Sequence, residues 1–174
     1  MVQIRERDVS ARDNFLVTKI LTEYAGEVGP KVLVNDRLDI AECTGAGVHL
    51  TTRSLPVDVV RRVTGPSMLV GVSTHNLEEV EAAEKGGADF VVFGPIFRTT
   101  SKAEYGRPVG IHGLEHVTSR VTIPVLALGG IKATNYLQVL DAGAAGIAGI
   151  SIFTEAEDLA ELVAEIKRSR ATTA

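Results

Sequence analysis

The sequence has no tryptophan and only one cysteine, Cys43. A single thiol cannot form an intramolecular disulfide or a cysteine metal cluster, and such usage is typical of proteins that fold in a reducing cytosol. The N-terminus has charges where a signal peptide would need an apolar run, so nothing in it predicts export. We therefore expect a cytoplasmic protein, with Cys43 as a small residue of its core.

The chain also lacks an excess of positive charge and long hydrophobic runs. Its formal net charge of −4 offers no basic surface for nucleic acid. Its apolar stretches are far shorter than the roughly 18 residues that cross a bilayer. With 174 residues, 45% of them hydrophobic, the chain can bury one sizeable core. The composition predicts a single domain over residues 1–170 with a disordered tail at 171–174, and partners that are neither nucleic acid nor membrane.

Short β-branched runs alternate with helix-like segments along the whole chain. Between the runs lie segments with helical spacing, such as 76–85, where Leu77, Val80 and Ala83 share one face. A last helix is predicted over 156–167. This alternation predicts parallel strands joined by crossover helices. The runs predict seven strands, at 2–4, 31–34, 47–50, 68–72, 90–93, 123–128 and 145–150.

Glycine-containing junctions recur where helices lead into strands, at 44–48, 86–90 and 142–146. Glycine readily ends a helix in the left-handed conformation, and this repetition favours a barrel over a doubly wound sheet. A complete barrel of this kind takes about 200 to 250 residues. The sequence therefore predicts an α/β fold of the (β/α)8 TIM-barrel type that lacks its first βα unit. Seven strands leave two open edges, which favours a homodimer.

Polar residues follow the first two predicted strands, at the end where parallel barrels carry their functional groups. Gln3, Arg5 and Arg7 alternate, so they would share one side of a strand, and two inward guanidinium groups need an anion. A solvated terminal strand is the alternative. Asp36 follows Asn35 and could hold Mg²⁺ through oxygen. An aspartate at this position is just as often a helix N-cap, and for the residue taken alone we expect the cap.

Later connections hold candidate phosphate sites. The longest, 94–110, has the length of a functional lid, and Lys102 within it either neutralises a phosphate or is an ordinary exposed lysine. Gly129-Gly130 and Gly149-Ile150-Ser151 follow the last two strands, where such barrels often bind phosphate through backbone N–H groups. Tight turns are the alternative reason for these glycines.

The histidines offer little. His49 lies within a strand and is expected to be a hydrogen-bonded core residue, while His112 and His116 are expected on a helix surface. His75 alone stands at a functional strand end. No spacing supports a zinc site or a Ser-His-Asp set.

Eight motifs follow one another along the chain: Gln-Ile-Arg-Glu-Arg at 3–7, Asn-Asp-Arg at 35–37, Gly-Val-His-Leu at 47–50, Gly-Val-Ser-Thr-His at 71–75, Gly-Pro-Ile-Phe at 94–97, Thr-Thr-Ser-Lys at 99–102, Gly-Gly-Ile at 129–131 and the segment 143–151. Taken together in this order, they resemble the thiamine phosphate synthase family and its sister, thiazole tautomerase. The resemblance implies a (β/α)8 barrel and a transferase that joins hydroxymethylpyrimidine diphosphate to thiazole phosphate and releases pyrophosphate. Mg²⁺ and cationic side chains would stabilise the departing pyrophosphate.

The resemblance also implies roles for individual residues. Asp36 would be the metal ligand. Catalytic roles fall on Arg7, Ser73 and Lys102, and substrate binding on Gln3, Arg5, Asn35, Thr99, Ser101, Gly130, Ile150 and Ser151.

Two positions depart from the synthase pattern. Ser54 stands where the family has a second metal-binding aspartate, and Arg7 replaces a lysine, which keeps the charge but changes its geometry. At residue 95 the tautomerase carries a catalytic histidine, whereas this chain has a proline, Pro95, as synthases do. Two alternatives to a synthase follow, namely a thiazole tautomerase and a non-catalytic regulatory protein that binds thiazole phosphate.

Overall fold

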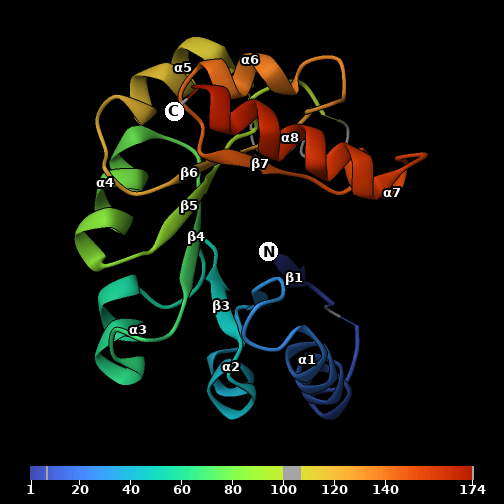
Figure 1. Ribbon diagram of the computed structural model, residues 1–174. Helices are drawn as coiled ribbons and strands as arrows, with labels where there is room; N and C mark the ends of the chain where they lie inside the picture. Colours follow the sequence, from blue (N-terminus) through green and yellow to red (C-terminus); the bar gives the residue numbers. More distant parts are fainter. Residues whose placement is uncertain (7, 100–106, 174) are drawn as a thin grey trace. The chain divides into compact units, whose positions relative to one another are not determined.

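The computed structural model describes residues 1–6, 8–99 and 107–173. The chain folds into two compact units (Figure 1). The first comprises Met1–Ser73 and Lys85–Asp89, and the second comprises Thr74–Glu84 and Phe90–Ala174. None of the helices in the described part of the chain is long and apolar enough to cross a membrane.

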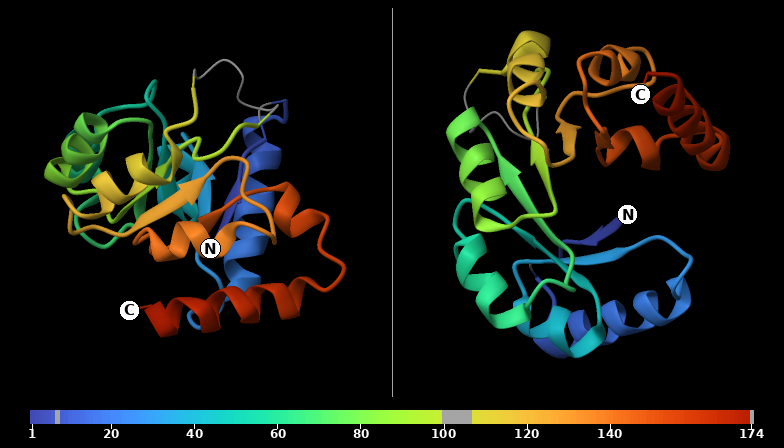
Figure 2. Two further views of the ribbon diagram at one scale, coloured as in Figure 1. Left: turned by 90° about the horizontal axis from the view of Figure 1, so that it is seen from above. Right: turned by 60° about the vertical axis from the view of Figure 1, so that its left-hand side comes forward.

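The first unit is built from βα repeats. Its strands pair in parallel and in sequence order, and its helices lie on one face of them (Figures 1 and 2). The elements are β1 (Val2–Ile4), α1 (Ala11–Ala25), β2 (Val32–Asn35), α2 (Leu38–Thr44), β3 (Gly47–Leu50), α3 (Val57–Thr64) and β4 (Val70–Thr74).

The second unit continues the same pattern. Strands β5, β6 and β7 pair in parallel and in sequence order, and α6 packs against both β7 and α8. The elements are α4 (Leu77–Gly86), β5 (Phe90–Phe93), α5 (Gly110–Thr118), β6 (Val125–Leu128), α6 (Tyr136–Asp141), β7 (Gly146–Ala148), α7 (Ser151–Thr154) and α8 (Leu159–Thr173).

All seven strands lie where the sequence predicts them, with ends that differ by a few residues. The junction glycines Gly45, Gly87 and Gly143 have φ values of 71°, 91° and 85°, which confirms their left-handed role. The short helix α7 was not predicted, and α8 continues past residue 167. The prediction for Cys43 was wrong: its side chain is exposed, because α2 turns Ile40 and Ala41 inward instead.

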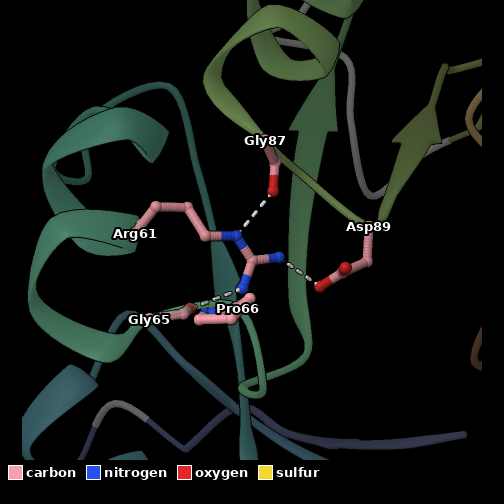
Figure 3. Close-up of a pocket in the computed structure, with 5 residues that line it drawn as sticks. All are labelled: Arg61, Gly65, Pro66, Gly87 and Asp89. Carbon is pink, nitrogen blue, oxygen red and sulfur yellow. Dashed lines mark hydrogen bonds and ion pairs between the residues drawn. The ribbon is translucent and has the colours of Figure 1, made fainter.

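Arg61 of α3 joins three segments at the ends of β4 and β5 opposite the predicted site. Its guanidinium group donates to the carbonyl oxygens of Gly87 at 2.6 Å and Met68 at 2.6 Å. It also pairs with Asp89 (Figure 3), whose carboxylate accepts the backbone N–H of Val70 at 2.7 Å. The arginine therefore satisfies carbonyl groups where two strands begin.

We expect Arg61→Met to lower the free energy of unfolding by about 2 to 3 kcal/mol, because the carbonyl groups lose their side-chain donor and the Asp89 carboxylate keeps only the N–H of Val70. Urea unfolding measures the change. Arg62→Met is the matched control, since Arg62 reaches Asp58 only at 3.5 Å and both side chains are exposed. Equal stability of the two variants would contradict the role of Arg61.

Glu84 of α4 holds the connection between α5 and β6. Its Oε1 accepts the hydroxyl of Thr122 at 2.6 Å and the backbone N–H groups of Thr122 at 2.7 Å and Ile123 at 3.2 Å. The side-chain hydrogen bond from Thr122, followed by the backbone ones, holds the pKa of Glu84 below its ordinary value of 4.5. The ionised carboxylate is therefore the form that stabilises this connection.

A pKa lowered by folding gives a contribution that is complete above the unfolded-state pKa and is lost as the pH falls through the folded-state pKa. We expect Glu84→Gln to cost about 1 kcal/mol at neutral pH. The difference from the wild type should shrink as the pH falls below 4.5 and through the lowered folded-state pKa of Glu84. Urea unfolding across this pH range measures it, with Glu81→Gln, at an exposed position of the same helix, as control. A difference independent of pH would show that the carboxylate charge plays no part.

Candidate functional site

The register of the first unit places four polar side chains on one face of its strands. Ile4, Val32 and Ala46 pack together with Ala25 of α1, so the alternate positions turn to the face away from the helices. Asn35 pairs with His49, and His49 with Gly71, in the parallel ladder. The residues gathered on this face, near the carboxyl ends of β1 to β4, are Gln3, Asn35, His49 and Ser73.

Two hydrogen bonds orient these side chains. Gln3 Nε2 donates to Asn35 Oδ1 at 3.1 Å, and His49 Nε2 lies 2.8 Å from Ser73 Oγ. His49 is only 4% exposed, which confirms that it is a hydrogen-bonded core residue. The sequence-predicted residues Gln3, Asn35 and Ser73 are therefore held on one face, and His49 holds the hydroxyl of Ser73 in place.

Asp36 has an unusual backbone conformation at the end of β2. Its φ is 59°, the only positive value among the non-glycine residues of the described chain, and its backbone N–H donates to the carbonyl of His49 at 2.9 Å. The prediction of a helix cap was wrong: α2 takes Arg37 as its N-cap, without a side-chain cap. Such a conformation costs of order 1 kcal/mol or more and concentrates at functional sites. The carboxylate follows Asn35 at an exposed position.

The neighbouring carboxylate, Asp39, is already paired. Arg37 donates to its two oxygens at 2.8 Å and 2.6 Å. This side-chain hydrogen bonding holds the pKa of Asp39 below its ordinary value and raises the pKa of Arg37. Asp36 is thus the carboxylate available at the end of β2.

The loop after β3 uses its hydroxyl groups internally. Ser54 Oγ accepts the backbone N–H of Thr51 at 2.8 Å and lies 3.1 Å from Thr51 Oγ1. Ser54 N–H donates back to the carbonyl of Thr51 at 3.0 Å. Among the described residues, no group of three His, Cys, Asp or Glu side chains could hold a metal ion. These residues therefore fit Mg²⁺ with one carboxylate, Asp36, and further oxygens would have to come from water or a bound phosphate.

The second unit forms a glycine turn after β6. Gly129 and Gly130 have φ values of 103° and 63°. A Cβ at Gly130 would lie 2.7 Å from both the carbonyl oxygen of Arg98 and the Cβ of Phe97. Asn135 donates to the carbonyl of Gly130 at 3.1 Å. These glycines are therefore required by the turn and by the close approach of segment 94–98, and phosphate binding by Gly130 stays a prediction.

The end of β7 leads directly into α7. Ile150 is the N-cap of this four-residue helix, gives no side-chain cap hydrogen bond and is 75% exposed. Ser151 is the first helical residue and is also exposed. Exposed N–H groups at such a turn can meet a phosphate, as the sequence predicts for Ile150 and Ser151.

The structure says less about the orientation of the other predicted site residues. β1 ends at Ile4, so strand alternation does not orient Arg5, which is exposed. Thr99 is partly exposed. The remaining three, Arg7, Ser101 and Lys102, lie outside the described residues.

One pair directly after β4 was missed by the sequence reasoning. Glu79 Oε2 accepts the backbone N–H of His75 at 2.7 Å and lies 3.2 Å from His75 Nδ1. Asn76 caps α4 by accepting the N–H of Glu79 at 2.9 Å. The signal was the Asn-x-x-Glu spacing at 76–79, which is a capping box. The pair fixes His75 directly after β4.

Consecutive parallel βα units with polar groups at the carboxyl ends of the strands define an α/β protein of the TIM-barrel type. A solved structure of the same type covers 98% of this chain with a TM-score of 0.85 and 33% identity, and the match spans 82% of that chain; it is a thiamine phosphate pyrophosphorylase from Pyrococcus furiosus. The protein belongs to the thiamine monophosphate synthase family, whose model matches residues 1–153.

Two relatives agree with this family. A Geobacter sulfurreducens protein, provisionally named a thiamine-phosphate synthase, is 46% identical over 86% of this chain and 71% of its own length. A thiamine-phosphate synthase of Clostridium novyi is 37% identical over 91% of this chain and 78% of its own length. The family and fold expected from the motifs are thus confirmed.

Proposed function

We propose that this chain is itself a thiamine-phosphate synthase, which couples hydroxymethylpyrimidine diphosphate with thiazole phosphate. The observation that carries the proposal is the left-handed Asp36 beside the oriented Asn35, on the strand ends that also present Gln3 and Ser73. Family membership supports the choice of substrates.

In the proposed reaction, the bond between the pyrimidine methylene carbon and the diphosphate oxygen breaks, and the thiazole nitrogen forms a bond to that carbon. Gln3, Asn35 and Ser73 would donate hydrogen bonds to the pyrimidine diphosphate, with Arg5 as a charged partner. Mg²⁺ held by Asp36 would supply positive charge to the departing pyrophosphate. The cationic Arg7 and Lys102 are assigned to the same leaving group.

The thiazole phosphate is assigned to the second unit. The backbone N–H groups of Gly130, Ile150 and Ser151 would bind its oxygens, with Thr99 and Ser101 as additional hydroxyl donors. The exposed, uncapped start of α7 supports this assignment. A phosphate can bind there without a charged side chain, because backbone N–H groups donate hydrogen bonds to its oxygens.

The test is pyrophosphate release from purified protein supplied with both substrates and Mg²⁺. The proposal expects release that requires all three components. Absence of release would leave a non-catalytic binder or a tautomerase as the alternatives. Calorimetric titration separates these cases: a synthase binds both substrates, whereas either alternative binds the thiazole phosphate alone.

We also propose a cytoplasmic homodimer. The free thiol of Cys43 at the surface suits a reducing compartment. Helix α1 buries the polar Asn14 and Thr18 but exposes an apolar face. The face consists of Leu16, Val17, Ile20, Leu21 and Tyr24.

The charges beside this apolar face favour a second copy of the chain as its partner. Lys19 and Glu23 lie one turn apart along its edge. If two α1 helices met antiparallel at Ile20, Lys19 of each copy would lie about 3 Å along the axis from Glu23 of the other. Exposed apolar area with a self-complementary charged edge is typical of a twofold interface.

We expect light scattering to give twice the monomer mass for the wild type and the monomer mass for Ile20→Glu. A buried carboxylate without a partner would prevent the apolar faces from meeting. Val63→Glu, on the exposed surface of α3 at 67% exposure, is the control and should leave the dimer intact. A monomeric wild type would contradict the assembly.

A further inference from the structure

Asn135 precedes helix α6 but does not cap it. It is the N-cap residue of this helix, yet its side chain makes no hydrogen bond to the first turn. Asparagine is preferred at this position because its side-chain oxygen usually accepts a backbone N–H group of that turn. The side chain of Asn135 is therefore committed to another part of the chain.

That other part is the glycine turn after β6. Asn135 Oδ1 accepts the backbone N–H of Lys132 at 2.8 Å, and Asn135 Nδ2 donates to the carbonyl oxygen of Gly130 at 3.1 Å. One end of the amide group thus accepts a hydrogen bond and the other end donates one. The side chain closes the turn between Gly130 and Lys132 instead of extending the hydrogen bonding of the helix.

The two peptide units that meet at Gly130 are each held by one hydrogen bond. The carbonyl oxygen of Gly129 accepts the backbone N–H of Phe97 at 2.9 Å. The carbonyl oxygen of Gly130 accepts the side chain of Asn135. In a trans peptide the N–H points opposite to the carbonyl of the same unit, so the N–H of Gly130 points away from Phe97.

Gly130 needs such restraint more than other residues do. Its φ is 63°, and glycine loses more conformational freedom on becoming ordered than any other residue. It also has no side chain through which neighbouring groups could hold it. The hydrogen bond from Asn135 therefore limits rotation of the peptide unit on the C-terminal side of Gly130, where the chain leaves the turn.

We propose that Asn135 is a positioning residue for the thiazole phosphate, because it holds Gly130 in the conformation in which its N–H meets a phosphate oxygen. The inference rests on the proposed function, which assigns the N–H of Gly130 to that phosphate. A backbone donor that is already ordered loses less conformational entropy when an anion binds. Asn135 acts through Gly130 and not through a contact of its own with the ligand.

Asn135→Ser tests this role in the full chain, because serine is also a preferred N-cap residue. Its hydroxyl can accept the backbone N–H of Gln138, the third residue of α6. This new cap offsets the hydrogen bonds that are lost, so the urea midpoint should stay close to that of the wild type. The shorter side chain leaves the carbonyl of Gly130 without its donor, and calorimetry should show an affinity for thiazole phosphate that is lower by about tenfold.

Asn76→Ser is the matched control. Asn76 precedes α4 and caps it in the usual way, by accepting the N–H of Glu79 at 2.9 Å. Serine can make the same cap, so this variant should bind thiazole phosphate as the wild type does. Asn135→Asp separates the two bonds of Asn135, since a carboxylate can accept the N–H of Lys132 but has no hydrogen for the carbonyl of Gly130.

NMR relaxation of the Gly130 N–H reports its mobility in the absence of any ligand. We expect an order parameter of about 0.85, that of a rigid backbone, in the wild type and in Asn76→Ser. In both variants of Asn135 it should fall below about 0.6. A purely structural role for Asn135 would instead lower the urea midpoint together with the affinity, and it would not loosen Gly130 at unchanged stability.

An equally rigid Gly130 in all four proteins, or equal affinity of the wild type and Asn135→Ser for thiazole phosphate, would overturn the inference. These outcomes are separate from those that test the synthase activity. Binding of thiazole phosphate that depends on Asn135, without pyrophosphate release from the two substrates, would support the inference and contradict the synthase. Pyrophosphate release together with an affinity for thiazole phosphate that does not depend on Asn135 would do the reverse.

Discussion

Asp36→Asn is expected to lower the kcat/KM for pyrophosphate release by at least about 100-fold. The amide keeps the size of the side chain but loses the negative charge that, in the proposed reaction, would hold the cation beside the leaving group. Asparagine also tolerates a positive φ, so the backbone of residue 36, at φ 59°, need not change. Steady-state assays at saturating Mg²⁺ measure the loss.

Asp39→Asn is the matched control for this variant. It removes the same charge three residues further on, where the carboxylate is paired with Arg37, and it should change activity by less than about threefold, since exposed pairs contribute little. Urea midpoints close to that of the wild type would show that both variants are folded. Full activity of Asp36→Asn would exclude Asp36 as the metal ligand.

Gly130→Ala is expected to lower the free energy of unfolding by about 3 kcal/mol, from left-handed strain and from overpacking. The φ of 63° disfavours any side chain. The added Cβ would also lie 2.7 Å from the Arg98 carbonyl oxygen and the Phe97 Cβ. Because Arg98 presents backbone there, segment 94–98 has to move. Thermal and urea unfolding measure the loss, and calorimetry with thiazole phosphate measures weakened binding.

Gly45→Ala is the control that separates the left-handed backbone strain from the contact that an added Cβ would make with a neighbouring segment. Gly45 has a similar φ of 71°, but a Cβ there would meet nothing within 4 Å. We expect it to cost only about 1 kcal/mol, the strain alone, and to leave thiazole phosphate binding unchanged. Equal costs for the two variants would show that the approach of segment 94–98 relaxes without penalty.

Much of the fold could be predicted because its signals are local. Buried parallel strands are continuous apolar runs, so runs such as Phe90–Phe93 mark them directly. Helix ends before β3, β5 and β7 need a left-handed residue, and glycine stands at each of them. Cys43 was misplaced because α2 has only seven residues, too few for helical spacing to show which face is buried.

Within the site, residue types could be predicted more readily than contacts. The motifs identified Asn35, Asp36 and Ser73, but the bonds from Gln3 to Asn35 and between His49 and Ser73 depend on strand register. The cap expected of Asp36 was wrong because the choice between a cap and a left-handed turn depends on the hydrogen bond that its N–H makes to β3. That partner is distant in sequence.

The sequence by itself determined the order and type of the elements, the positions of the turning glycines and the family. Each of these follows from side-chain period, backbone freedom or the identity of residues near one another in the chain. Only the tertiary structure decided that Asp36 is left-handed, that Gln3 donates to Asn35 and that His49 contacts the hydroxyl of Ser73. Those outcomes depend on the geometry of neighbouring strands and loops, because a hydrogen bond forms only where the fold brings donor and acceptor into alignment.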